Sequence, residues 1–326
     1  MTILVTGAAG FIGFHLSQKL LDRDEAVIGI DNLNDYYDVR LKEARLKLLR
    51  ERPGFVFEQI DIGDPAAMRE LAGRHRQITR IVNLAAQAGV RYSIENPRVY
   101  ARSNLDGFLE VLELARFLPH CEHLVYASSS SVYGAGSTPP FSTDERCDTP
   151  VSLYAATKRA NELMAYTYSH LYRLKLTGLR FFTVYGPWGR PDMAPYLFTE
   201  AVLQGRKLRV FNNGDMRRDF TYVDDIVAGT IAALDHPPAD DRQNPPHRLY
   251  NIGNHRSEKL MDFIGEIERA CGRKAELVFE PMQPGDVRET FADIEPLRAD
   301  FGYQPTISIA EGVPRFVAWY RSYYGV

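Results

Sequence analysis

The first half of the chain alternates short apolar runs with longer stretches whose apolar residues recur at helical spacing. Residues 3–6 form the first apolar run, and residues 11–23 carry the first helical pattern. Further strands are predicted at residues 26–30, 55–59, 80–84, 123–127 and 176–181, with helices at 65–72, 99–118 and 153–172. Repeated alternation of buried strands and helices predicts an α/β fold with a Rossmann-type, doubly wound parallel sheet.

The pattern changes after residue 185, where a loop-like segment rich in Gly and Pro is followed by shorter, mixed elements. Later elements are predicted as a strand at 219–223, helices at 224–234, 259–271 and 310–324, and a polar surface loop at 237–247. We expect residues 1–184 and 217–253 to form the Rossmann domain. Residues 185–216 and 254–326 would form a smaller mixed α/β lobe over the carboxyl ends of the strands, where open α/β sheets bind ligands.

Charge and composition narrow the class of protein. The 326 residues carry a net charge of −3, which gives no reason to expect nucleic acid or an anionic membrane as a partner. No run is apolar enough to span a bilayer, and the first strand leaves no room for a signal peptide. Cys121, Cys147 and Cys271 are far apart and have no metal-ligand spacing, so we expect reduced thiols, no metal site and a cytoplasmic protein.

A glycine-rich segment, TGAAGFIG at residues 6–13, lies between the first strand and the first helix. In this position Gly7 permits the tight turn, Gly10 lets the backbone approach a pyrophosphate, and Gly13 allows the helix to pack on the sheet. The segment therefore predicts a dinucleotide site, which would also include the backbone of Phe11 and Ile12.

Strand ends supply the other candidate cofactor residues. Asp31 ends the second strand, 18 positions after Gly13, and its carboxylate can hold ribose hydroxyls while repelling a 2′-phosphate. NAD is therefore favoured over NADP, with Asn32 as a neighbouring contact. After the third and fourth strands we expect contacts to the cofactor from Asp61, Ile62, Leu84, Ala85 and Ala86, although an ordinary strand end and simple packing explain these five residues about as well.

Tyr154 and Lys158 lie four residues apart in a predicted helix, so their side chains share one face. A tyrosine is a poor base at neutral pH, but a neighbouring ammonium group favours its phenolate form. The pair therefore suits proton transfer beside a bound cofactor. The spacing alone is a weak signal, and an exposed amphipathic helix would show it too.

These motifs together resemble the extended short-chain dehydrogenase/reductase family over essentially the whole chain. Within the family the chain is most similar to UDP-glucuronate 4-epimerases. The matching segments are TGAAGFIG, NLAA at residues 83–86, YASSSSVYG at 126–134, the Tyr154/Lys158 pair, DNLNDYYD at 31–38, LKEARL at 41–46, QAGVRYS at 87–93 and RFFTVYGPWGRPDM at 180–193. Asn83 stands where related enzymes often have His.

The resemblance implies a catalytic role for three side chains. Tyr154 would be the base, Lys158 would modulate its pKa and bind the NAD ribose, and Ser129 would bridge Tyr154 and the sugar 4-hydroxyl. Related dehydratases typically carry acidic residues where this chain has Ser130 and Ser131, and decarboxylases typically have a Glu. Hydroxyl groups there can donate hydrogen bonds to a substrate carboxylate, which favours an acidic sugar over elimination chemistry.

The resemblance also places substrate contacts in the second half of the chain. Thr183 should contact the sugar and its carboxylate, and Arg190 is the candidate for an ionic contact with that carboxylate, since Arg matches carboxylate geometry. The expected contacts to the UDP part are Phe211, Arg218, Asp286 and Arg288, for which core packing or a solvated charged face are the competing explanations.

The resemblance therefore implies reversible, NAD-dependent 4-epimerisation of UDP-glucuronate to UDP-galacturonate through a 4-keto intermediate. The alternatives are a UDP-glucose/galactose 4-epimerase, a UDP-glucuronate decarboxylase and a non-catalytic NAD-binding scaffold. The expected partners are a UDP-uronic acid and a second copy of the chain, because the helices at 99–118 and 153–172 resemble those of a four-helix dimer interface in relatives.

Overall fold

The computed structural model describes residues 1–283 and 287–326, and its chain divides into two compact units. The first unit comprises Met1–Gly136, Glu145–Arg180 and Val227–Tyr250. The second comprises Ser137–Asp144, Phe181–Ile226 and Asn251–Val326. Both units are therefore discontinuous in sequence, and the cofactor and sugar roles predicted for the two parts of the chain stay predictions.

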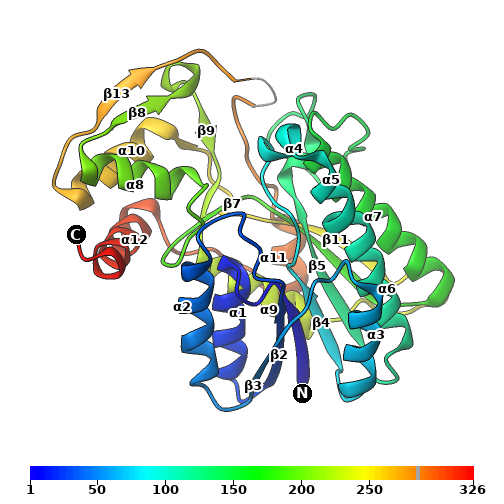
Figure 1. Cartoon of the computed structure of the whole chain (residues 1–326). Coiled ribbons are helices and arrows are strands. Elements are labelled where there is room, and N and C mark those ends of the chain that lie inside the picture. The colour runs from blue at the N-terminus through cyan, green and yellow to red at the C-terminus, as the bar shows by residue number, and fades with distance from the viewer. Residues whose placement is uncertain (284–286) are drawn as a thin grey trace. The chain divides into compact units, whose positions relative to one another are not determined.

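A seven-stranded sheet forms the centre of the first unit (Figure 1). Its strands follow the spatial order β3-β2-β1-β4-β5-β6-β11, and the neighbouring pairs from β3 to β5 are parallel. The bounds are β1 (Thr2–Thr6), β2 (Ala26–Asp31), β3 (Phe55–Gln59), β4 (Arg80–Asn83), β5 (His123–Ser129), β6 (Leu176–Phe181) and β11 (His247–Ile252). This strand order confirms the predicted Rossmann-type sheet.

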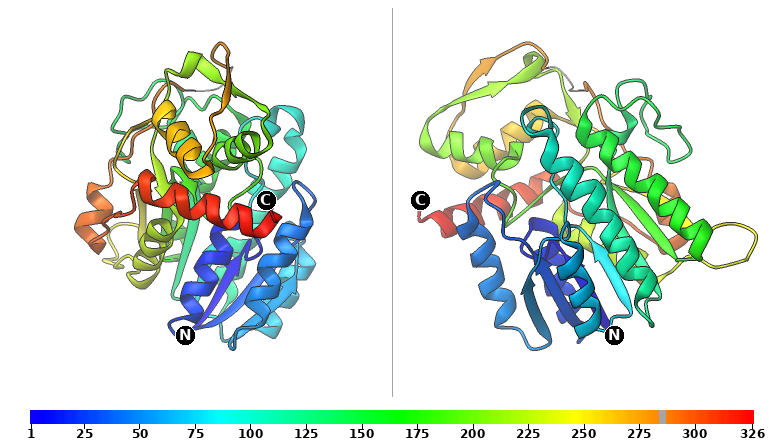
Figure 2. Two further views of the ribbon diagram at one scale, coloured as in Figure 1. Left: turned by 90° about the vertical axis from the view of Figure 1, so that its left-hand side faces the viewer. Right: turned by 45° about the vertical axis from the view of Figure 1, so that its right-hand side comes forward.

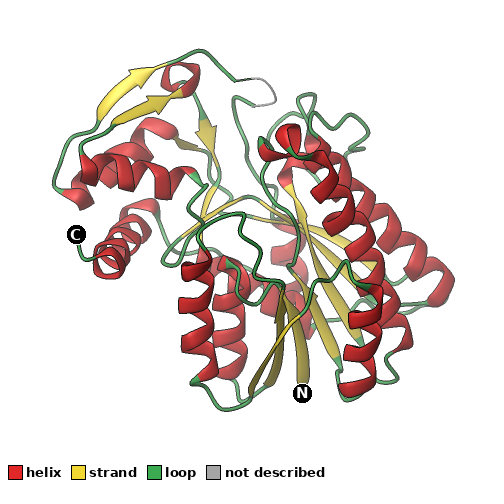
Figure 3. Cartoon of the chain, viewed as in Figure 1, coloured by secondary structure: helices red, strands yellow, loops and turns green. Residues whose placement is uncertain are grey.

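Helices cover both faces of this sheet (Figures 2 and 3). Helices α1 (Phe11–Leu21) and α2 (Val39–Arg50) lie on one face, and α3 (Pro65–Arg74), α6 (Gly107–Phe117) and α7 (Leu153–Tyr172) lie on the other. Side chains define where two of these helices begin. Asp64 accepts hydrogen bonds from the first-turn N–H groups of α3, and Ser152 accepts one from Ala155 in α7.

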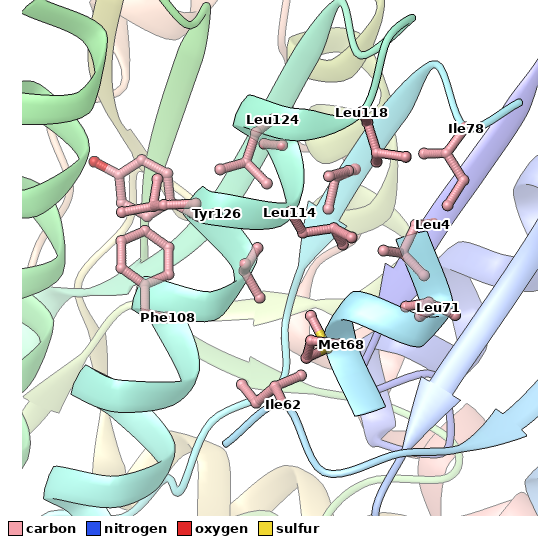
Figure 4. Close-up of a cluster of buried hydrophobic side chains, with 14 of the residues drawn as sticks. Leu4, Ile62, Met68, Leu71, Ile78, Phe108, Leu114, Leu118, Leu124 and Tyr126 are labelled. Carbon is pink, nitrogen blue, oxygen red and sulfur yellow. The ribbon is translucent and has the colours of Figure 1, made fainter. Parts of the chain in front are cut away.

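A cluster of buried apolar side chains in the first unit lies between its sheet and helices α3 and α6 (Figure 4). Strands contribute Leu4 and Tyr126, and the helices contribute Met68 and Phe108. Ile62, from the loop after β3, packs in the same cluster. Burial of this apolar surface, at roughly 25 cal/mol per Å², holds the strands in the register that aligns their carboxyl ends.

Most predicted elements are present with bounds shifted by a few residues, and two of them differ further. The helix predicted at 99–118 is divided into α5 (Pro97–Tyr100), a π-helical segment (Ala101–Asp106) and α6. Helix α2 was not predicted, because its charged residues mask the apolar stripe. The loop predicted at 237–247 ends one residue early, since His247 begins β11 and its ring stacks on Tyr126.

The second unit is built from three small two-stranded sheets and several helices. Its strand pairs are β7 (Thr183–Tyr185) with β10 (Phe220–Tyr222), β9 (Arg217–Arg218) with β12 (Glu258–Lys259), and β8 (Lys207–Val210) with β13 (Glu276–Phe279). Its helices are α8 (Ala194–Gln204), α10 (Leu260–Cys271), α11 (Glu295–Phe301) and α12 (Ile309–Tyr324), and α9 (Val223–Asp235) runs from this unit into the first.

Stacked rings of Phe220 and Phe263, 4.0 Å apart, lie in the core of the second unit. Within the described residues of the whole chain, none of the helices combines the length and the apolar character needed to cross a membrane.

Candidate active site

The glycine-rich turn after β1 is packed so closely that side chains are excluded. Gly7 has a φ of +72°, and a Cβ there would lie 2.9 Å from the backbone nitrogen of Ala85. A Cβ on Gly13 would lie 2.1 Å from the carbonyl oxygen of Gly7. Gly10 is the N-cap of α1 and offers no capping side chain. The first N–H groups of α1 therefore suit an external anion such as a pyrophosphate, and the turn fits NAD.

Thr6 links this turn to the end of β4. Its hydroxyl donates to Oδ1 of Asn83 at 2.6 Å and accepts the N–H of Ala85 at 3.0 Å. Asn83 is thus occupied in holding two strand ends together. The backbone of Leu84 and Ala85 therefore lies beside the glycine-rich turn, and the expected cofactor contacts of Leu84, Ala85 and Ala86 stay predictions.

Asp31 lies at the carboxyl end of β2 and is buried. One of its oxygens accepts the N–H of Leu33 at 2.8 Å, and Nζ of Lys42 lies 3.8 Å from the same oxygen. Buried Lys42 also donates to Oδ1 of Asn34, which fixes the loop that follows Asn32. The sequence analysis missed Lys42, because its position in α2 gave no sign that its ammonium group is buried against Asp31.

Asp61 and Ile62 follow β3 and differ in their surroundings. Asp61 accepts the N–H of Gly63 at 2.9 Å and a hydrogen bond from Arg102 at 3.2 Å. Ile62 is buried in the core cluster, and a Cβ on Gly107 would lie 2.8 Å from its side chain. The side chain of Ile62 therefore packs against α6, and the expected cofactor contacts of both residues stay predictions.

Helix α7 carries Tyr154 in its first turn and Lys158 one turn later. Lys158 is 3% exposed, and its Nζ donates to the carbonyl oxygen of Ala127 in β5 at 2.8 Å. Burial lowers the pKa of Lys158 to about 8, and the negative charge of Glu162 opposes this shift. The pKa of Lys158 therefore lies close to neutral pH, and whether its side chain is charged depends on its neighbours.

Ser129 ends β5, and Ser130 and Ser131 begin the short 3-10 helix that follows (Ser130–Tyr133). The hydroxyl oxygen of Ser129 accepts the backbone N–H of Ser131 at 3.2 Å and its hydroxyl at 2.9 Å. A hydroxyl has two acceptor sites and one proton. With both acceptor sites used, the Ser129 hydroxyl can still donate its proton, as the predicted contact with the sugar 4-hydroxyl requires.

A buried carboxylate that the sequence analysis missed lies one turn after Lys158. Glu162 is 2% exposed and forms a two-point ion pair with Arg180, which is 1% exposed. Ser128 donates to the same carboxylate. Two buried charges 18 positions apart leave no local pattern, so only the folded structure reveals their pairing.

The predicted substrate residues of the second unit contact other residues of the same unit. Thr183 begins β7, and its N–H donates to the carbonyl oxygen of Asp219. Two of the arginines contact nearby acids, as Arg190 donates through two nitrogens to Asp192 and Arg288 lies 2.9 Å from Asp215. The remaining contacts place Arg218 against the carbonyl oxygens of Arg217 and Arg288, and Phe211 under the guanidinium of Arg209.

Asp286, the predicted ribose contact, lies outside the described residues. Among the described residues, no group of three or more His, Cys, Asp or Glu side chains is arranged to hold a metal ion.

The chain is similar to named epimerases in sequence and in structure. It is 47% identical to UDP-glucuronate 4-epimerase 4 of Arabidopsis thaliana over 99% of this chain and 76% of that protein. The crystal structure of UDP-glucuronic acid 4-epimerase from Bacillus cereus, in complex with UDP-glucuronic acid and NAD, has a TM-score of 0.90 and 33% identity over 99% of this chain and 100% of that one.

UDP-glucose 4-epimerase of Thermotoga maritima, crystallised with UDP-glucose, has a TM-score of 0.88 and 29% identity over the same shares of the two chains. Residues 3–253 match the model of one protein family. That match spans most of the chain and includes the glycine-rich turn, Ser129 and the Tyr154/Lys158 pair. The chain belongs to the NAD dependent epimerase/dehydratase family.

Proposed function

We propose that the protein catalyses the reversible, NAD-dependent 4-epimerisation of UDP-glucuronate to UDP-galacturonate through a 4-keto intermediate, without decarboxylation. The observation that carries this proposal is the turn after β5. Ser129 ends the strand that Lys158 contacts, and Ser130 and Ser131 begin the 3-10 helix that follows, where the family resemblance implies that decarboxylases and dehydratases have an acid. Relatives named for this activity, at 44–47% identity over 99% of this chain, support the same substrate.

In the proposed reaction Tyr154 takes the proton of the sugar 4-hydroxyl and later returns it. Lys158, held by the carbonyl oxygen of Ala127, places its positive charge one helical turn away and favours the phenolate. Ser129 donates a hydrogen bond at the 4-oxygen. NAD, when bound, supplies the reversible hydride acceptor for C4, and its pyrophosphate would lie on the turn from Gly7 to Gly13, with its adenine ribose at Asp31.

The intermediate of this reaction is a β-keto acid, which readily loses carbon dioxide. We propose that Ser130, Ser131, Thr183 and Arg190 hold its carboxylate in an orientation that disfavours this loss. For this role the Ser131 hydroxyl, which donates to Ser129 in the structure, must turn its proton to the carboxylate when substrate binds. Contacts to the UDP part would come from Phe211, Arg218 and Arg288. A Thr183→Ala variant should lower the rate of epimerisation or release a pentose product, and an unchanged rate and product purity would refute this role.

The test is proton NMR of the purified protein with UDP-glucuronate and no added NAD. UDP-galacturonate as the only product supports both the function and a retained cofactor. A UDP-pentose would move the assignment to decarboxylation. Turnover of UDP-galactose but not of UDP-glucuronate would favour a UDP-glucose/galactose 4-epimerase. If neither sugar nucleotide is converted, even with added NAD, a non-catalytic scaffold would be favoured.

We also propose that the protein is a homodimer that works in the cytoplasm. The dimer is supported by apolar side chains exposed on α6 and α7, among them Phe117 at 67% and Leu163 at 55%. A reducing compartment is consistent with Cys121, Cys147 and Cys271, all of which are free thiols. Light scattering should give twice the chain mass for the wild type and the single mass for Leu163→Glu.

A further inference from the structure

We infer that Glu162 is a positioning residue of the proposed epimerase. Its carboxylate keeps Lys158 charged and binds the end of β5, at Ser128 and Ser129, to α7, the helix that carries Tyr154 and Lys158. The inference rests on the proposed function and adds to it a side chain that contacts neither substrate nor cofactor. Glu162 follows Lys158 by four residues on α7, so the two side chains lie on the same face of the helix.

The first argument is the number of partners that converge on one carboxylate. Oε1 of Glu162 accepts Nε of Arg180 at 2.8 Å and the hydroxyl of Ser128 at 2.6 Å. Oε2 accepts a second nitrogen of Arg180 at 2.9 Å and one of Arg159, also at 2.9 Å. Burial raises the pKa of Glu162, but these hydrogen bonds and the charge of Arg180 together hold it below its ordinary value. Glu162 is therefore charged at neutral pH.

The second argument is where these partners lead. Ser128 immediately precedes Ser129, and Lys158 contacts Ala127, so successive turns of α7 are attached to neighbouring residues of β5. The guanidinium of Arg180 also lies over the ring of Tyr133, 4.8 Å from its centroid, in the 3-10 helix that contains Ser130 and Ser131. The Glu162–Arg180 ion pair thus joins α7 to both ends of the segment from Ser128 to Tyr133, which contains the three serines of the proposed site.

The third argument is electrostatic. The ionisable groups around this part of α7 include Arg159 on the helix itself, Arg180 on β6, Tyr126 on β5, Tyr133 on the 3-10 helix, Tyr100 on α5, Cys147, and His247 on β11. Of the described acids, Glu162 is the one whose charge raises the pKa of Lys158 against burial. Without it, the ammonium of Lys158 would lose its proton at a lower pH and Tyr154 would lose the charge that favours its phenolate.

The test is a Glu162→Gln variant, which keeps the shape of the side chain, removes its charge and replaces one acceptor oxygen by an NH2 donor. We expect the alkaline limb of the profile of kcat against pH to shift to lower pH by about one unit or more. A matched control is Leu112→Ala, which opens a cavity in the buried face of α6 without touching the network. That variant should be less stable than the wild type, but its kcat should fall at the same alkaline pH as in the wild type.

A second readout needs no substrate. Difference ultraviolet titration of each protein against its Tyr154→Phe partner reports the pH at which the Tyr154 phenolate forms. In Glu162→Gln this pH should rise while the alkaline limb of kcat falls. This titration separates the inference from the proposed function, because it remains measurable if UDP-glucuronate proves not to be a substrate.

Loss of Glu162 alone leaves Arg180 buried without its carboxylate, which can prevent folding. The double variant Glu162→Gln/Arg180→Gln removes both charges and keeps two groups that can hydrogen-bond to each other. It should fold and still show the lowered limb. An unshifted limb together with an unshifted phenolate titration, in either variant, would overturn the inference and leave Glu162 a purely structural residue.

Discussion

The two units of the chain hold their predicted site residues in different ways. In the first unit, Asp31 is buried beside Lys42 of α2, and Lys158 is buried against the carbonyl oxygen of Ala127 in β5. In the second unit, the side chain of Arg288 is 72% exposed, and Arg190 contacts an acid only two residues away.

Buried charges need fixed partners. Exposed ion pairs contribute only about 0–1 kcal/mol to the free energy of unfolding and exchange partners at little cost. The difference suggests a preformed cofactor and proton-transfer site in the first unit. In the second unit we expect an anionic substrate to replace the acidic partner of Arg288, whose side chain is exposed, more readily than that of Arg190, whose side chain is 22% exposed.

The strongest test of the preformed site is Tyr154→Phe, which removes the proton-transferring hydroxyl and keeps the ring. We expect kcat to fall by about 10²–10⁴-fold, the usual contribution of general acid–base catalysis, while bound NAD per chain stays unchanged. The matched control is Tyr166→Phe, an exposed position on the same helix, which should keep wild-type activity. Equal losses in both variants would mean that the helix, rather than the hydroxyl, is being perturbed.

Two histidines that begin strands of the central sheet, His123 in β5 and His247 in β11, make the first unit sensitive to acid. Burial lowers the pKa of His123 and of His247 to about 4. In the unfolded chain these rings titrate near 6.5, so on acidification the unfolded chain gains protons that the folded chain excludes. The stability from each ring is fully present above pH 6.5 or so, and up to about 3 kcal/mol per ring is lost as the pH falls to about 4.

Urea unfolding at a series of pH values measures this effect. His123→Gln should remove a large part of the slope between pH 6.5 and 4, because a glutamine does not titrate. The same slope in the variant as in the wild type would assign the acid sensitivity to other groups.

Gly13→Ala tests how closely the cofactor turn is packed. The added methyl group would lie 2.1 Å from the carbonyl oxygen of Gly7, so the turn must shift. We expect a loss of about 1–3 kcal/mol in the free energy of unfolding and less NAD retained through gel filtration. Gly73→Ala is the matched control, since nothing lies within 4 Å of its added Cβ. Full NAD retention in Gly13→Ala would place the cofactor elsewhere.

Arg190→Ala tests a predicted substrate contact of the second unit and should have the smallest effect. We expect KM for UDP-glucuronate to rise about tenfold, or about 1.4 kcal/mol, with a change in kcat of less than a few-fold. KM for a neutral UDP-hexose should change less. Arg206→Ala serves as control, because Arg206 contacts Glu200 and has no predicted role at the site. Equal changes for acidic and neutral sugars would exclude a carboxylate contact.

Local patterns in the sequence predict a large part of this arrangement. The alternation of strands and helices predicted the sheet, and the spacing of Tyr154 and Lys158 placed both in one helix. What the sequence did not reveal depends on contacts between distant segments. Lys42 and the Glu162–Arg180 pair are charged residues in amphipathic or strand positions, where solvent exposure is the ordinary expectation. Their burial follows from the packing of whole elements, for which no local pattern exists.

The most direct test of the central claim is the fate of the hydrogen at C4. UDP-glucuronate deuterated at C4 is incubated with the purified protein in ordinary water, and the product is analysed by NMR and mass spectrometry. Hydride removal and return within one closed site predicts UDP-galacturonate that retains the deuterium at C4. Solvent hydrogen at C4, or a pentose as the main product, would contradict the account.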